Sequence, residues 1–118
     1  MLQRGIQHFN TGEYFRCHEV LEEAWRTEHG PRRLFLQSLI HIAVAFHHWQ
    51  QGNLVGAIGQ LRKGLDKLEA YLPVYEGIDT GQLHLDAQAA LDHMEKAGSR
   101  GASDLRLGHR AAPEFEIR

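Results

Sequence analysis

The chain has 118 residues, of which 42% are hydrophobic and 24% are charged, the ordinary balance of one small globular domain. Its formal net charge of -2 provides no basic surface, so we expect no nucleic-acid partner. The single cysteine, Cys17, excludes an internal disulfide and fits a reducing compartment. We see no leader sequence, and the most apolar run, 39–46, is too short to span a membrane. We therefore expect a cytoplasmic protein with no membrane contact.

Three helices are predicted in the first half of the chain. Apolar residues three and four apart predict a short helix through Phe9, which Asn10 and the residues after it end. A second helix is predicted over 13–29. Pro31 starts a third helix, which carries residues 34–51. The third is apolar on most sides, which is typical of a helix buried within a bundle.

The predicted fourth helix, 54–72, has the most regular pattern, because its leucines and isoleucine alternate in steps of four and three. Gly56, Gly59 and Gly64 interrupt it, and each costs about 1 kcal/mol relative to alanine in a helix interior. We therefore expect another helix to approach closely at these glycines.

A fifth helix is predicted, with Asp79 or Thr80 as its N-terminal cap and an apolar stripe that reaches Met94. From Gly98 onward the helical period is lost. The fold class is therefore all-α: a compact bundle or array of about five helices with an extended C-terminal tail.

This division places a single helical domain over 1–97 and the tail over 98–118. Leu105 alternates with Leu107, and Phe115 with Ile117, as inward-facing residues of an extended segment do. We expect the tail to lie across its own bundle or to reach a neighbouring chain.

Polar residues on the second and third helices are the candidate functional residues. His18 and Glu22 are four residues apart, so their side chains can meet, and Gln37 and His41 repeat this spacing. If the two helices pack antiparallel across the short turn at Pro31, both pairs would face each other. The predicted polar site consists of His18, Glu19, Glu22, Gln37 and His41, with Trp25 and His48 supporting it.

Two interpretations of this site stay open. A histidine at the edge of a core helix is usually a hydrogen-bonded structural group, and a neighbouring glutamate is its ordinary partner. Alternatively, His18, Glu22 and His41 are ligands of a divalent metal ion, or His18 is the base of a hydrolase-like enzyme. The run that begins at His18 is HExxE, which lacks the second histidine of the HExxH zinc proteases.

These motifs resemble a known family. The run Phe9–Phe15 (FNTGEYF), followed by HEVLE from His18 and by Trp25, resembles the signature of domain-of-unknown-function family 309. The block from Phe35 to His48 is similar to a later block of that family, and the resemblance covers roughly residues 5–95. It implies a small all-helical fold with no established activity. The polar residues of the family map onto His18, Glu19, Glu22, Trp25 and Gln37.

The sequence departs from the family pattern at Ser38, where the family usually has glycine, and at His41, where it usually has glutamine. A residue that the family replaces by an amide is not an obligatory metal ligand, which favours a hydrogen-bond network centred on His18 and Glu22. We therefore predict a non-catalytic structural or interaction module, whose partner could be a second copy bound through the tail or the helix faces. A metal-binding or hydrolase-like enzyme is the alternative.

Overall fold

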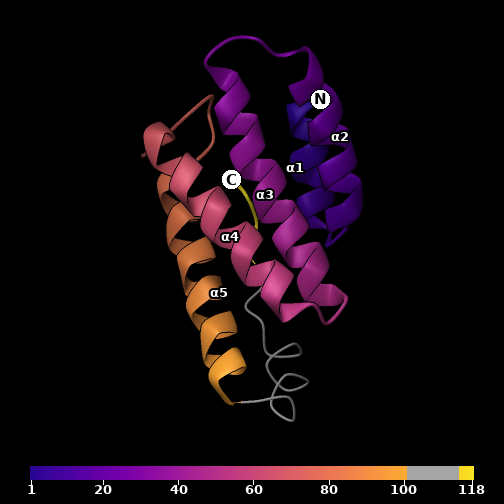
Figure 1. Ribbon diagram of the computed structural model, residues 1–118. Coiled ribbons are helices and arrows are strands. Elements are labelled where there is room, and N and C mark those ends of the chain that lie inside the picture. Colours follow the sequence, from indigo (N-terminus) through magenta and orange to yellow (C-terminus); the bar gives the residue numbers. More distant parts are fainter. Residues whose placement is uncertain (101–114) are drawn as a thin grey trace.

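The computed structural model describes residues 1–100 and 115–118. These residues form five α-helices, one short 3₁₀ helix and no strand, which confirms the predicted all-α fold (Figure 1). None of these helices combines the length and the apolar character needed to cross a bilayer. In chain order the elements are α1 (Leu2–Asn10), α2 (Tyr14–Thr27), α3 (Arg32–Gln50), α4 (Leu54–Leu68), η1 (Glu69–Tyr71) and α5 (Thr80–Arg100).

Helix α3 is the central element. Each helix packs on the next one in the chain, and Figure 1 shows α3 between α2 and α4. As predicted, α3 is apolar on most sides, since residues from Phe35 to Trp49 are buried around its circumference. The one polar side chain among them, Ser38, donates a hydrogen bond of 2.6 Å to the Phe35 carbonyl of its own helix.

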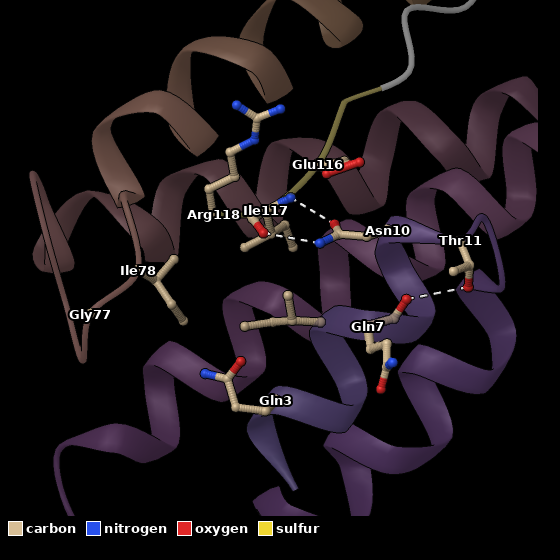
Figure 2. Close-up of a pocket in the computed structure, with 10 residues that line it drawn as sticks. Gln3, Gln7, Asn10, Thr11, Gly77, Ile78, Glu116, Ile117 and Arg118 are labelled. Atoms are coloured by element: carbon tan, nitrogen blue, oxygen red, sulfur yellow. Dashed lines mark hydrogen bonds between the residues drawn. The ribbon is translucent and has the colours of Figure 1, made fainter.

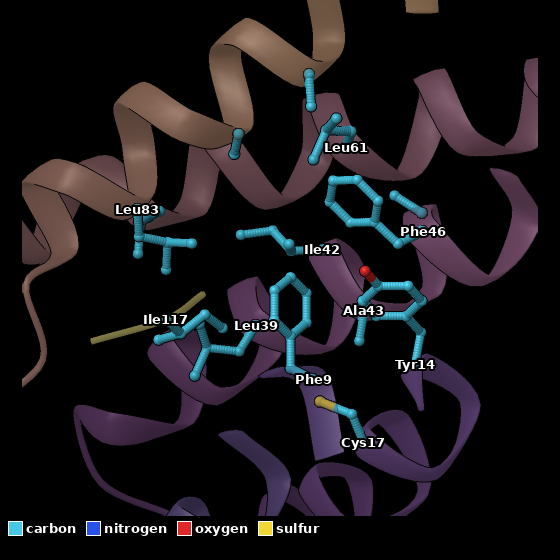
Figure 3. Close-up of a cluster of buried hydrophobic side chains, with 14 of the residues drawn as sticks. Phe9, Tyr14, Cys17, Leu39, Ile42, Ala43, Phe46, Leu61, Leu83 and Ile117 are labelled. Atoms are coloured by element: carbon cyan, nitrogen blue, oxygen red, sulfur yellow. The ribbon is translucent and has the colours of Figure 1, made fainter. Parts of the chain in front are cut away.

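Aromatic rings join α1 and the start of α2 to the end of α3. Phe9, Tyr14 and Phe46 meet with ring centroids between 5.0 and 5.8 Å apart (Figure 3). Burying such a side chain contributes about 1.5–3 kcal/mol, so this cluster fixes α1 on the bundle. Cys17 lies in the same core, where burial raises the pKa of its thiol to about 12.

Three helix ends differ from the sequence-based prediction. Helix α2 ends at Thr27, two residues early, and α4 gives way to the 3₁₀ turn after Leu68 instead of running to residue 72. Helix α5 continues to Arg100, so the predicted tail boundary at residue 98 falls inside this helix. A Cβ atom on Gly98 would lie 3.2 Å from the Leu54 side chain, so this glycine permits close packing of α5 on α4.

A tight turn joins η1 to α5. The backbones of Tyr75 and Ile78 exchange two hydrogen bonds, and Gly77 takes the positive φ of +77° that the turn requires. The Asp79 carboxylate then accepts a hydrogen bond from the Gln82 amide, which confirms one of the two predicted caps of α5. Ile78, in this turn, is buried and lines a cavity together with Ile6 of α1.

The glycines of α4 have unequal surroundings. A Cβ atom on Gly64 would lie 2.8 Å from the Ile42 side chain and 3.0 Å from the Ser38 carbonyl oxygen, so α4 approaches α3 closely there, as predicted. The prediction is wrong at Gly59, because no atom lies within 4 Å of the corresponding position.

These two glycines form a matched test of the α3–α4 contact. Gly64→Ala should lower the free energy of unfolding by about 1–3 kcal/mol, because the added methyl group meets a backbone oxygen that cannot move alone. Gly59→Ala should raise it by about 0.5–1 kcal/mol, because alanine favours the helix and the site is open. Urea denaturation of the two variants measures both changes. Equal effects of the two substitutions would contradict the close approach at Gly64.

Candidate functional site

The first predicted pair of polar residues forms on α2. His18 Nε2 lies 2.6 Å from a carboxylate oxygen of Glu22, whose other oxygen lies 3.4 Å from the Arg26 guanidinium. The side chains of His18 and Glu22 are 25% and 33% exposed, so the pair lies at the edge of the core. The second ring nitrogen, His18 Nδ1, is buried and has no hydrogen-bond partner among the described residues. Glu19, the next residue, is exposed.

Trp25 links the end of α2 to the start of α3. The Arg33 guanidinium lies 4.0 Å from the centre of the Trp25 ring and donates hydrogen bonds to the carbonyls of Trp25 and Glu28. Because the last carbonyls of a helix lack partners within the helix, Arg33 caps α2 from the neighbouring helix. Trp25 therefore has a packing role at the α2–α3 turn.

The second predicted pair does not form, because His41 faces α4. Its Nδ1–H donates a hydrogen bond of 2.7 Å to the Gln60 side-chain oxygen, and Lys67 Nζ donates one of 2.8 Å to its Nε2. Both ring nitrogens are thus occupied by residues of α4. The close approach of α4 at Gly64, which lies between these two partners along the helix, explains why the ring turns to this side.

The remaining predicted residues are also separate from the α2 pair. His48 accepts a hydrogen bond of 3.3 Å from the Asn53 side chain, and a Cβ atom on Gly56 would lie 3.1 Å from its ring, so α4 is close at this glycine too. The Gln37 side chain is partly exposed. The expected convergence of Gln37 and His41 on His18 is therefore corrected.

The separation of these residues limits the metal-binding interpretation. The described residues contain no group of three or more His, Cys, Asp or Glu side chains placed to hold a metal ion. His18 and Glu22 therefore supply two ligands at most from this part of the chain, whereas a catalytic zinc site uses three protein ligands.

The end of the chain forms a second site, on α1. The Asn10 side chain donates a hydrogen bond of 3.1 Å to the Ile117 carbonyl and accepts one of 2.7 Å from the Ile117 amide (Figure 2). Phe115 packs on Phe9 and Phe46, with ring centroids 5.5 and 5.4 Å apart. This part of the tail lies across its own bundle. The predicted alternation of Leu105 with Leu107 lies outside the described residues.

A cavity of about 560 Å³ adjoins this segment. It opens between α1, the turn at Gly77 and the end of the chain, and Figure 2 shows amide side chains of α1 along it. Its polar lining includes Gln3, Gln7, Asn10, Glu116 and Arg118. This cavity therefore belongs to α1, the turn at Gly77 and the tail.

Sequence reasoning did not find the partners that define these contacts. It assigned Asn10 a role in ending α1 only, although the asparagine belongs to the FNTGEYF run. Gln60 and Lys67 are ordinary helix-surface residues in sequence, and only the position of α4 shows that they bind His41. The FNTGEYF run could have indicated a role for Asn10, whereas no sequence pattern indicated one for Gln60 or Lys67.

The comparison with protein families identifies the family that the sequence resembles. The model of the family described as Domain of unknown function (DUF309) matches residues 2–59. Through these residues the chain belongs to the DUF309 family. The match confirms the resemblance seen in the sequence and includes Asn10, His18, Glu22 and Trp25. It ends within α4, so the segment 115–118 lies outside it.

Two relatives extend the comparison. The uncharacterized protein YpuF of Bacillus subtilis (strain 168) is 30% identical over 93 residues, which cover 76% of this chain and 53% of the relative. An uncharacterized protein of Aquifex aeolicus (strain VF5) is 25% identical over 96 residues, which cover 80% of this chain and 29% of the relative. This chain thus spans about half the length of the first relative and under a third of the second. No solved structure matches the chain significantly.

The environment of His41 predicts a pH dependence of stability. Burial lowers the pKa of His41 from 6.5, and the charges of Lys67 and Lys63 lower it further, while the bond to Gln60 opposes the shift. As the pH falls below about 6.5, the unfolded chain binds a proton at this residue before the folded chain does, so the free energy of unfolding decreases.

The variant His41→Gln removes this contribution and keeps a side chain that can bind Gln60. Urea denaturation between pH 8 and pH 5 should show the wild type losing stability relative to the variant as the pH falls through 6.5 and below. A difference between the two proteins that stays constant over this range would contradict the assigned environment of His41.

Proposed function

We propose that this DUF309 protein is a non-catalytic interaction module, in which a rigid helical bundle binds an extended segment of protein chain against α1. The observation that carries this proposal is the contact between Asn10 and Ile117. One side chain of the bundle binds the amide and the carbonyl of one residue of an extended segment, as peptide-binding domains do. Binding, in this proposal, belongs to the α1 side of the bundle.

In this proposal the polar residues of α2 and α3 stabilise the bundle. The pair of His18 and Glu22 supports successive turns of α2, and the contacts of His41 with Gln60 and Lys67 join α3 to α4. Each of the two histidines contacts side chains of the bundle, as a structural role requires.

The partner is a protein, either a second copy of this chain or another chain that presents a similar segment. The net charge of -2 supports a protein partner over nucleic acid. We propose a cytoplasmic location for this interaction, which the single buried Cys17 thiol supports, since the domain uses no disulfide of its own.

One observation favours the alternative, a metal-binding or hydrolase-like enzyme. His18 Nδ1 is buried without a partner among the described residues, while Glu22 holds the opposite nitrogen of the ring. A carboxylate that orients a histidine in this way is common in metal sites and in general-base catalysis. The two functions therefore make opposite predictions for His18.

Elemental analysis of protein purified without a histidine tag, together with a His18→Gln variant, tests the proposal. We expect no stoichiometric metal in either protein. We also expect His18→Gln to lower the free energy of unfolding by about 0.5–1 kcal/mol, because it removes the partly exposed contact of the imidazole with Glu22. Glu19→Gln is the matched control on the same helix, and it should leave stability unchanged. Near-stoichiometric metal that is lost in His18→Gln would contradict the proposal and support the enzyme.

A further inference from the structure

We infer that the cleft between α1 and α5 is a recognition site for an extended protein segment with an aromatic residue two positions before an aliphatic one. In this inference residues 115–118 occupy the site in place of a partner and compete with it. The inference rests on the proposed function and specifies its ligand and its regulation.

The first element of recognition is the backbone. Asn10 lies at the end of α1, where its side chain is free of the helix, and binds both polar groups of the Ile117 backbone. This pair of bonds matches the pair that a neighbouring strand would offer to an extended residue. These two hydrogen bonds require an extended backbone at the bound residue and are independent of the side chain of that residue.

The second element is the alternation of side chains. In an extended segment, residues two apart point to the same side. Phe115 packs on Phe9 and Phe46, and Ile117, which is only 4% exposed, joins the core cluster that contains Leu39 and Leu83 (Figure 3). Glu116, between them, is exposed. The site therefore selects the first and third residues and leaves the second free.

The third element is the charge beside the last residue of the segment, Arg118. A second cavity, of about 430 Å³, lies on the α5 side of the segment and is lined by Asp79, Asp86 and Arg118. These carboxylates favour a basic residue directly after the aliphatic one. The cavities on both sides of the segment also leave room for side chains larger than those of residues 115–118.

The segment 115–118 that occupies the site belongs to the same chain, so it competes with any partner for this site. A tethered ligand typically meets its site at an effective concentration on the order of 1 mM, so a free partner binds only as far as it displaces the segment. Weakening residues 115 and 117 should therefore raise the affinity of the full chain for a partner segment, although it removes apolar surface from the protein.

Fluorescence anisotropy with a labelled peptide of residues 112–118 (APEFEIR) tests this inference. We expect the full-length variant Phe115→Ala/Ile117→Ala to bind the peptide about tenfold or more tightly than the wild type. Val55→Ala, which removes an exposed apolar side chain on α4, is the matched control and should bind as the wild type does. A peptide with alanine in place of its phenylalanine and isoleucine should not bind.

Adding Asn10→Ala to the double variant should abolish the gain. Asn10→Asp keeps the acceptor for the amide but sets a carboxylate oxygen against the carbonyl, so it should reduce the gain. Circular dichroism confirms that each variant is folded. Equal affinity of the wild type and the double variant, or a gain that persists without Asn10, would overturn the inference. Absence of peptide binding by every variant would also overturn it. The proposed function fails through a different result, stoichiometric metal that depends on His18.

Discussion

The rest of the structure depends on the burial of α3 on two sides. A helix that is apolar around most of its circumference has to be covered by both of its neighbours, so α2 and α4 pack against opposite faces of it. The glycine at position 64 permits α4 to approach closely enough for this cover. Polar side chains on α3 can then reach solvent or polar partners only at the edges of its contacts with α2 and α4. His41 lies at the margin with α4, whereas His18 and Glu22 remain on α2.

The contact with the end of the chain is thereby separated from His18 and Glu22 on α2. The segment 115–118 lies on α1, and its contacts are made by Phe9 and Asn10 at the end of that helix and by Phe46 at the end of α3. The part of the chain that matches the DUF309 family supplies these contacts, while the segment lies beyond the match. In this account His18 and Glu22 stabilise the helical bundle.

The sequence predicted what depends on local periodicity. The five helices, the buried character of α3 and the contact of His18 with Glu22 follow from spacings within one helix, and the structure contains all of them. The neighbour that His41 faces depends on the order in which helices pack, which periodicity does not specify. The pairing of Asn10 with Ile117 joins residues 107 positions apart, and no local pattern indicates such a contact. The glycines of α4 show the same limit. The sequence predicted a close helix contact at all of them, and only the packing shows that this holds at Gly64 and fails at Gly59.

The central claim is that the bundle holds the end of the chain through Asn10. Hydrogen exchange of the Ile117 amide, followed by nuclear magnetic resonance in the full chain, tests it most directly, since this amide donates to the Asn10 side chain. The account predicts that the Ile117 amide is protected in the wild type and in His18→Gln, and that it loses protection in Asn10→Ala. An Ile117 amide that exchanges in the wild type as rapidly as in a free peptide would contradict the account.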